Sequence, residues 1–588
     1  MDKTLNLQTI RHSTAHVLAG AVQKLYPDVK FGIGPAIENG FYYDFDFGDQ
    51  KISEEDLPKI EAEMEKIIAE NLPFIRKEIS VGEAREVFAD QPYKLELLED
   101  KAQIGNRSLH PFTYKVGGFT DLCKGPHVKN TSEIKAFKLT RLAGAYWKGS
   151  EKNPMLTRIY GLAFETQKEL DEYLKLQEEA KKHDHRKLSK ELDFFSQNEM
   201  VGPGLILWHP KLSVVREEIE LWWRKEHRKR GYQYVYTPHI GKEVLWQTSG
   251  HTDFYKDLMY PPLKDERDDV YYVKPMNCPF HVLIYKSRPR SYKELPLRWG
   301  ELGTVYRYEL EGVRHGILRP RGFTQDDAHI ICTKEQIVPE LEGVLDFALE
   351  MNTVFGFDNL HYELSLRDPE TPEKYIGDTE GWEMAQKVLK DILDSRGVEY
   401  NAGIGEAKFY GPAIDLKVED AVGRLWQGTT IQFDFNLPEK FEMTYVGEDG
   451  KDHTPYMIHR TLLGSMERFV GCLIEHYAGA FPVWLAPVQV VVIPISERHN
   501  EYARSVVEKL RTTNYELRTN LDDRDETMQA KIRDAQLQKV PYMLIVGDKE
   551  EKAGTVSERG RSGKDYGQVE IDEFITNIKK EIEEKTIN

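Results

Sequence analysis

The stretch from Thr304 to Cys332, TVYRYELEGVRHGILRPRGFTQDDAHIIC, constrains the fold more than any other part of the chain. Its first residues alternate with a period of two, and it becomes apolar again after Gly322, so it predicts two paired strands joined by a loop. The loop is rich in arginine, whose planar fork donates two parallel hydrogen bonds to phosphate or carboxylate. The hairpin therefore indicates either a clamp for an anionic, planar ligand or a charged loop that faces water.

Further polar residues in the same stretch favour the clamp. Glu309 follows the first strand, and Gln325, Asp327 and His329 lie on the returning strand. Burying so many polar groups in one hairpin costs free energy, which makes sense only where they bind something. We therefore predict that this hairpin belongs to a functional site.

Three motifs carry a resemblance to a known family. The run Arg307-Tyr308-Glu309, followed by RGFTQDDAH, resembles motif 2 of class II aminoacyl-tRNA synthetases. Its residues resemble in particular those of threonyl-tRNA synthetases. The segments KPMNCP at 274–279 and MIHRTLLGSMERF at 457–469 extend the resemblance, the second as motif 3. It implies a threonine–tRNA ligase that activates threonine with ATP, transfers it to tRNA(Thr) and hydrolyses mischarged Ser-tRNA(Thr).

Length and composition are compatible with such an enzyme. A chain of 588 residues predicts three or four domains. Its four cysteines are far apart, which predicts no disulfide framework and a cytoplasmic location. No apolar run approaches the roughly 18 residues of a membrane span. The net charge of −18 argues against non-specific nucleic-acid binding but allows local basic contacts with tRNA.

Four segments are predicted, at 1–164, 165–192, 193–486 and 487–588. The second is rich in Glu and Lys and has the spacing of an amphipathic linking helix. A continuous apolar strand at 488–493, followed by alternating helices and strands, predicts an α/β unit at the end of the chain. The resemblance implies that the other large segments are an editing domain and a class II catalytic domain with an antiparallel sheet, so the fold class is multidomain α+β and α/β. It also implies a bacterial type without the usual amino-terminal ubiquitin-like domain.

Two pairs of possible metal ligands occur in the first segment. His12 and His16 are four apart on a predicted helix and share a face, and Cys123 and His127 are also four apart. This spacing suggests zinc, although two unrelated pairs would look the same. The resemblance implies instead a metal-free editing pocket, so we expect no zinc here. The candidate editing residues are His12, His16, Lys94, Asp121, Cys123 and His127.

A different metal site is expected in the central segment. Cys278 and His281 alone suggest half a zinc finger without its second half, and a lone cysteine is more often a small buried hydrophobe. The resemblance pairs Cys278 with His329 and His459 and makes His281 a neighbour. One cysteine and two histidines with an open fourth position are typical of a catalytic Zn²⁺, here one per subunit.

Adenylate formation requires no side-chain nucleophile, because positive charge and positioning lower its barrier. The resemblance implies that Arg307, Arg319 and Arg468 are catalytic, with Mg²⁺ accompanying ATP. It assigns ATP to Arg307, Glu309, Arg319, Phe323, Gln427, Thr430 and Arg468. It assigns threonine to Met276, Gln325, Asp327, Tyr410 and Gln432. It further implies a homodimer, and an anticodon-binding domain in which Glu550 and Arg559 read bases; without the resemblance those two are ordinary surface charges.

The same residues allow three rival interpretations. A prolyl-type class II enzyme is disfavoured because Cys278, His329 and His459 serve no purpose in a proline pocket. A non-catalytic regulator that binds RNA would be expected to lose Arg307, Arg468 or these metal ligands, and all are present. A metallohydrolase built on the histidines and cysteine of the first segment would be recognised by metal analysis of that domain.

Overall fold

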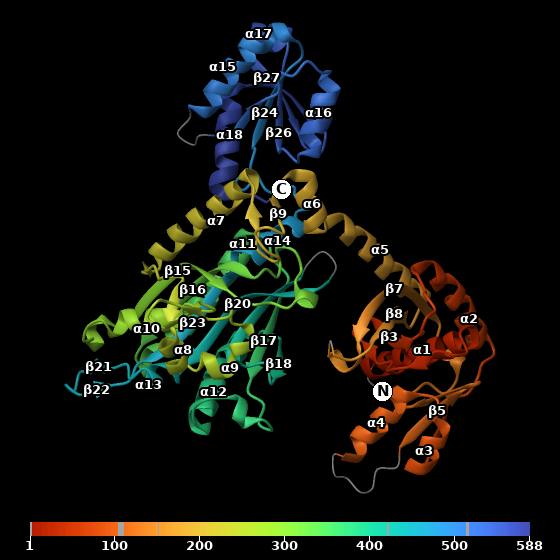
Figure 1. The fold of residues 1–588 in the computed structure, drawn as a ribbon. Coiled ribbons are helices and arrows are strands. Elements are labelled where there is room, and N and C mark those ends of the chain that lie inside the picture. Colours follow the sequence, from red (N-terminus) through yellow and green to blue (C-terminus); the bar gives the residue numbers. More distant parts are fainter. Residues whose placement is uncertain (1–2, 104–110, 151, 420–422, 513–516, 588) are drawn as a thin grey trace. The chain divides into compact units, whose positions relative to one another are not determined.

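The computed structural model describes residues 3–103, 111–150, 152–419, 423–512 and 517–587 (Figure 1). The chain forms two compact units, Met1–Glu178 and Glu179–Asn588. Within the part described, no helix is long and apolar enough to cross a membrane.

The first unit packs a long helix on an antiparallel sheet (Figure 1). Helix α1, Lys3–Leu25, lies against β3 (Gly40–Asp46) and β8 (Met155–Phe164), which pairs in turn with β7 (Ala136–Tyr146). Strand β2 (Ala36–Ile37) turns through Asn39 into β3, as the sequence predicts. The aromatic side chains of Phe41, Tyr43 and Phe45, on one face of β3, are fully buried and share a core with α1 and α2 (Leu57–Ala69). Because successive side chains of a strand point to opposite faces, this burial explains why aromatic residues occupy every second position there.

A smaller sheet lies beside it and carries part of the predicted editing set. Its strands are β4 (Ile75–Glu78), β5 (Phe112–Val116) and β6 (Phe119–Leu122), all antiparallel. Asp121 lies on β6, and Lys94 lies on α4 (Pro92–Gln103). The small helix α3, Val81–Val87, packs in the same region as α4.

The predicted linking helix is two helices. Helix α5 spans Gln167–His183 and α6 spans His185–Leu192. Asp184 separates them because it leaves helical geometry, with φ −53° and ψ 118°, and its side chain accepts a hydrogen bond from the Arg186 N–H. This arrangement caps the start of α6, a preference of aspartate that helical periodicity does not register.

The second unit is built on an eight-stranded sheet in the order β11-β15-β16-β23-β20-β19-β17-β18. The six central strands are antiparallel, which confirms the predicted class of sheet, and only the two edge pairings are parallel. The strands are β11 (Gln233–Tyr234), β15 (Leu297–Tyr306), β16 (Gly322–Cys332), β17 (Leu360–Leu366), β18 (Tyr400–Ile404), β19 (Ala413–Glu419), β20 (Leu425–Asp434) and β23 (Tyr456–Ser465). The hairpin predicted at 304–332 is thus β15 and β16 at the centre of this sheet.

Helices α7 (Pro210–Lys229), α11 (Ile337–Val354) and α14 (Met466–His476) share one apolar core with this sheet. The sequence predicts a helix over 214–230, and α7 begins four residues earlier because Pro210 suits the first helical turn. The sequence predicts strands at 205–208 and 232–237 on either side of this helix, and both are shorter than predicted. Leu207–Trp208 (β10) pairs only with Phe195–Ser196 (β9), and only Gln233–Tyr234 of the segment before Pro238 is strand.

The last domain is the predicted α/β unit with a hairpin added. Strands β25 (Thr519–Leu521), β24 (Val490–Pro494) and β26 (Tyr542–Val546) are parallel, and β27 (Thr555–Gly560) and β28 (Asp565–Glu570) continue the sheet antiparallel. Alternate residues of β24 pack on α15 (Asn500–Arg511) and α18 (Ile571–Glu584), or on α16 (Met528–Leu537) across the sheet. Burial on both faces is why β24 reads as an unbroken apolar run. The strand predicted at 515–519 falls partly on residues outside those described.

Candidate functional sites

One pocket in the second unit gathers every residue assigned to ATP, threonine or the metal. Its floor is formed by β16, β20 and β23, and the loop between β15 and β16 lies over one end. Because the residues come from three strands, two helices and the loops between them, only the folded sheet brings them together. The residues concerned are Met276, Cys278, Arg307, Glu309, Arg319, Phe323, Gln325, Asp327, His329, Tyr410, Gln427, Thr430, Gln432, His459 and Arg468.

Cys278, His329 and His459 form a buried cluster at one end of this pocket. Their possible ligand atoms lie within 4.8 Å of one another. Cys278 begins α10 (Cys278–Lys286), and the register of β16 and β23 places His329 directly opposite His459. Burial raises the pKa of the Cys278 thiol and lowers that of His329. A neutral imidazole keeps the lone pair that binds a metal.

The two histidines present nitrogen lone pairs to this cluster. His459 Nε2 lies 2.7 Å from Asp434 Oδ2, so that nitrogen donates its proton and Nδ1 carries the lone pair. His329 Nε2 is buried and has no hydrogen-bond partner among the described residues. An orphaned nitrogen beside a thiol and a second imidazole fits a cation such as zinc.

Three arginines, Arg307, Arg319 and Arg468, line the same pocket. Arg468, near the start of α14, donates from Nε to the carbonyl oxygen of Leu318 at 3.1 Å. Burial, and then the charges of Arg307 and Arg319, lower the pKa of Arg468. Three guanidinium groups in one pocket favour a ligand with several negative charges, as a polyphosphate has. Glu309 accepts a hydrogen bond from Arg319 Nε at 3.1 Å, so in this state it holds the arginine.

Asp415 is a carboxylate that sequence reasoning did not single out. It is buried on β19, and its Oδ1 accepts from Gln427 Nε2 and Thr430 Oγ1, each at 2.6 Å. It therefore fixes two of the predicted ATP-binding side chains. The signal was present, because Asp415 interrupts the apolar strand AIDLKV. Tyr410 donates to Gln432 Oε1 at 2.8 Å, which orders the side predicted for threonine. Tyr255 and Lys408 also line the pocket and were missed.

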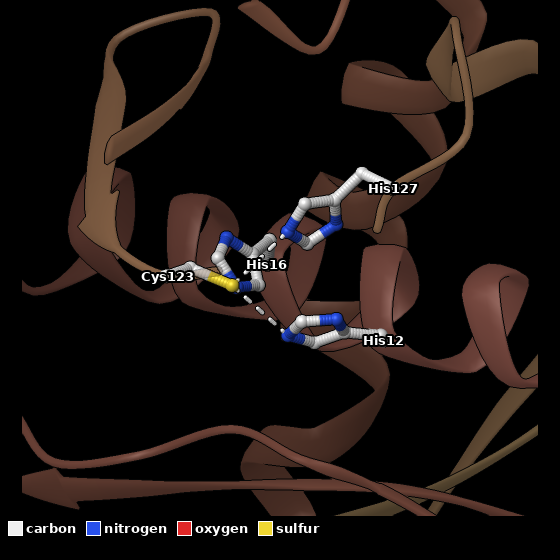
Figure 2. Close-up of side chains that lie close together, drawn as sticks. All are labelled: His12, His16, Cys123 and His127. Atoms are coloured by element: carbon white, nitrogen blue, oxygen red, sulfur yellow. Dashed lines mark hydrogen bonds between the residues drawn. The ribbon is translucent and has the colours of Figure 1, made fainter. Parts of the chain in front are cut away.

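The first unit holds a second cluster, shown in Figure 2, in which the two predicted pairs meet. The ligand-type atoms of His12, His16, Cys123 and His127 lie within 4.8 Å of one another. Cys123 Sγ is 3.3 Å from His12 Nε2 and 3.4 Å from His127 Nε2. His12 and His16 project from α1, and the other two residues come from the loop after β6. The spacing thus reflects one site rather than two unrelated pairs.

A buried charge pair lies beside this cluster. Lys94 Nζ contacts Asp121 Oδ1, and Tyr43 donates its hydroxyl proton to Asp121 Oδ2 at 2.6 Å. His16 Nε2 is 3.6 Å from the same carboxylate oxygen. Burial, and then the neighbouring His12 and Lys94, lower the pKa of His16, so its ring is neutral. Tyr43 was expected only as a core residue of its strand, because its partner lies far away in the sequence.

The two residues predicted to read the anticodon lie in the last domain. Glu550, on α17 (Asp548–Ala553), accepts a hydrogen bond from the Gly547 N–H at 3.0 Å. Arg559, on β27, pairs with Asp565 at 3.0 Å. Both are half-buried, and each makes a local contact that stabilises its own element.

Comparison with known proteins matches three parts of the chain. Residues 261–477 match the tRNA synthetase class II core domain (G, H, P, S and T), and residues 489–581 match the anticodon binding domain. Residues 113–160 match the threonyl and alanyl tRNA synthetase second additional domain. These matches cover most of the central pocket, the last domain, the strand that bears Asp121 and the loop that bears Cys123.

Similarity to individual proteins extends over the whole chain. It is 52% identical over 587 residues to a threonine–tRNA ligase of Sulfurihydrogenibium sp., covering 99% of this chain and 90% of that one. It is 51% identical to the threonine–tRNA ligase of Borreliella burgdorferi, covering 100% and 99%. A crystal structure of the RNA binding domain of threonyl-tRNA synthetase from Cryptosporidium parvum superposes with a TM-score of 0.64 and 36% identity, covering 68% of this chain and 98% of that one. With the class II sheet and its arginine-lined pocket, these similarities establish that the chain belongs to the threonyl-tRNA synthetase family, the class II threonine–tRNA ligases.

Proposed function

We propose that the central pocket forms threonyl-adenylate at its arginine end and selects threonine at its Cys278–His329–His459 end. The observation that carries this proposal is that both groups line a single pocket. Threonine between them would have its carboxylate toward the arginines and its side chain toward the metal ligands.

Arg307, Arg319 and Arg468 would stabilise the charge that develops on the phosphates, and Mg²⁺ would accompany ATP. These roles are supported by the hydrogen bonds that hold the arginine side chains in place. Arg468 is anchored by the carbonyl oxygens of Leu318 and Gln427, and Arg307 Nε donates to the carbonyl oxygen of Pro275 at 3.3 Å. Donors fixed before the substrate arrives need little reorganisation during the reaction, which is the basis of electrostatic catalysis.

Cys278, His329 and His459 would hold one zinc ion. Bound there, zinc supplies a Lewis-acid contact for the amino and hydroxyl groups of threonine. Valine has a methyl group in place of that hydroxyl, and an apolar pocket separates such isosteres by only about 10²-fold. Leaving polar groups unmatched rejects valine much more strongly. Asp327 and Gln432 lie close enough to the cluster to complete the polar surface around the substrate.

Serine has the hydroxyl and lacks only a methyl group, which is worth roughly 1–3 kcal/mol. That difference is too small for translation, so a second site that hydrolyses Ser-tRNA(Thr) is needed. We place this editing reaction at His12, His16, Cys123 and His127, without a metal. Neutral imidazoles at this cluster can accept a proton from water, and the Lys94–Asp121 pair can orient the seryl group.

A homodimer is also proposed. Apolar side chains on α7 and just after it are exposed, namely Leu221, Tyr236, Ile240 and Val244. The helix at 214–230, the strand after it and Pro238 resemble motif 1 of class II enzymes, which implies a dimer interface, and an apolar surface at this place supports an interface with a second subunit. None of the four cysteines, all of them within the described residues, forms a disulfide, in keeping with the proposed cytoplasmic location.

Metal analysis of the purified full-length protein tests the two sites together. We expect one equivalent of zinc, and we expect Cys278→Ala to lose it while Cys123→Ala keeps it. One equivalent that disappears in Cys123→Ala instead would place the metal in the first unit and overturn both assignments.

A further inference from the structure

His281 is a buried histidine that the proposed reaction does not use. It lies one turn after Cys278 on α10 and is fully buried. Its Nδ1 is 2.8 Å from Nδ1 of His329. Its Nε2 is 3.1 Å from Oε2 of Glu301, on the neighbouring strand β15. Both ring nitrogens are thus engaged, so His281 is not itself placed as a metal ligand.

Glu301 fixes the direction of these hydrogen bonds. Its carboxylate accepts from the Thr237 N–H at 2.8 Å and from the Thr237 hydroxyl at 2.9 Å, and Lys274 Nζ lies 3.8 Å away. Burial would raise the pKa of Glu301, but His281, Lys274 and Thr237 together outweigh burial and lower it. An ionised carboxylate can only accept hydrogen bonds.

The positions of the protons on the His281 and His329 rings follow from this one constraint. Because Glu301 accepts, His281 carries its proton on Nε2 and presents a lone pair on Nδ1. His329 must then donate from Nδ1 to that lone pair. Its own lone pair is left on Nε2, which is the nitrogen that is buried without a hydrogen-bond partner in the described part of the chain.

We infer that Glu301 and His281 are positioning residues that fix His329 in the tautomer whose Nε2 can bind a metal. This inference rests on the proposed zinc site. The second histidine of the site is held in an analogous way, since Asp434 accepts a hydrogen bond directly from Nε2 of His459. One ligand is therefore oriented by a carboxylate and the other by a carboxylate acting through an intervening histidine.

The affinity of the metal-free protein for zinc tests the inference. It is measured by competition with a zinc-binding dye at fixed pH, without reference to activity. His281→Phe keeps a ring of similar size but removes the acceptor, and loss of such a partner weakens metal binding by about 10–100-fold. His281→Gln restores an oxygen that accepts from His329 and an amide that donates to Glu301, so its affinity should lie within a few-fold of the parent.

His185→Phe is the matched control. His185 is also fully buried and hydrogen-bonded to a glutamate, with Nδ1 2.7 Å from Glu475 Oε1, but among the described residues it contacts none of Cys278, His329 and His459. Its zinc affinity should equal that of the parent. Unchanged affinity in His281→Phe would overturn the inference, as would equal losses in His281→Phe and His185→Phe or in His281→Phe and His281→Gln. If the parent itself binds no zinc, or His329→Ala binds it normally, the proposed zinc site fails instead.

Discussion

Arg468 and Leu318 join two motifs that lie 150 residues apart, through a hydrogen bond of 3.1 Å from Arg468 Nε to the Leu318 carbonyl oxygen. The bond ties the start of α14 to the loop between β15 and β16. Leu318 is itself fully buried, and Gly471 on α14 makes room for it. The arginines of both motifs are thereby held over the same pocket before any substrate binds.

This arrangement predicts a large effect on activation. Arg307→Ala or Arg468→Ala should lower kcat for adenylate formation by about 10²-fold or more, because each removes a fixed positive charge from the phosphates. Threonine-dependent pyrophosphate exchange measures the effect. Arg298→Ala is a control on β15, since Arg298 pairs with Glu340 outside the pocket, and it should remain active. Normal exchange in both pocket variants would contradict the assignment of the motifs.

The editing site makes a separate prediction. A His12→Ala, Cys123→Ala double variant should charge threonine at the rate of the parent but accumulate Ser-tRNA(Thr), because the cluster in the first unit is proposed to act only on mischarged tRNA. Deacylation of preformed Ser-tRNA(Thr) is the measurement. Lys124→Ala changes an exposed neighbour of Cys123 and should deacylate normally. Equal deacylation by the double variant and the parent would remove the editing role from these residues.

The last domain can be tested independently of the chemistry. Arg559→Ala should impair aminoacylation of tRNA(Thr) while pyrophosphate exchange stays intact, because a base contact affects only the tRNA-dependent step. Arg524→Ala is a suitable control, as Arg524 forms surface ion pairs with Asp522 and Asp534 in the same domain. If both reactions of Arg559→Ala fall together, the contact with Asp565 is structural and base reading is withdrawn.

The buried carboxyl group of Glu467 should make the stability of the protein depend on pH. Burial raises the pKa of this carboxyl group to about 7, so the folded protein holds its proton at a pH where the unfolded chain has released it. The contribution of Glu467 to the free energy of unfolding is fully present below about pH 4.3, the ordinary pKa of a glutamate in the unfolded chain. It is lost as pH rises toward 7. Glu467→Gln should therefore show a smaller fall in thermal midpoint between pH 5 and pH 7 than the parent. Parallel pH profiles for the two proteins would exclude the shift.

The sequence predicts the elements of this fold well where a single period dominates. The two strands around the arginine-rich loop, the helix of His12 and His16 and the apolar strand β24 are all present, although β15 begins seven residues before Thr304. Local periodicity does not reveal the break at Asp184, because that break depends on a side-chain cap. The metal ligands came from the resemblance, since Cys278 and His459 are too far apart for spacing to pair them.

Buried polar partners are the part of the site that sequence patterns did not supply. Asp415, Tyr43 and His281 contact side chains that are distant in sequence, and only the tertiary structure brings each pair together. Tyr43 illustrates this, because the alternation of residues on β3 correctly predicts that it is buried but does not indicate its hydrogen bond to Asp121. Such residues look like ordinary core positions until the tertiary structure supplies their partners.

The most direct test of the account is amino-acid-dependent pyrophosphate exchange by the parent and by Cys278→Ala, measured across the twenty amino acids. The parent should exchange with threonine, more weakly with serine and negligibly with valine. Cys278→Ala should lose threonine-dependent exchange together with its zinc. Threonine exchange at the parental rate in Cys278→Ala would contradict the claim that this cluster selects the substrate.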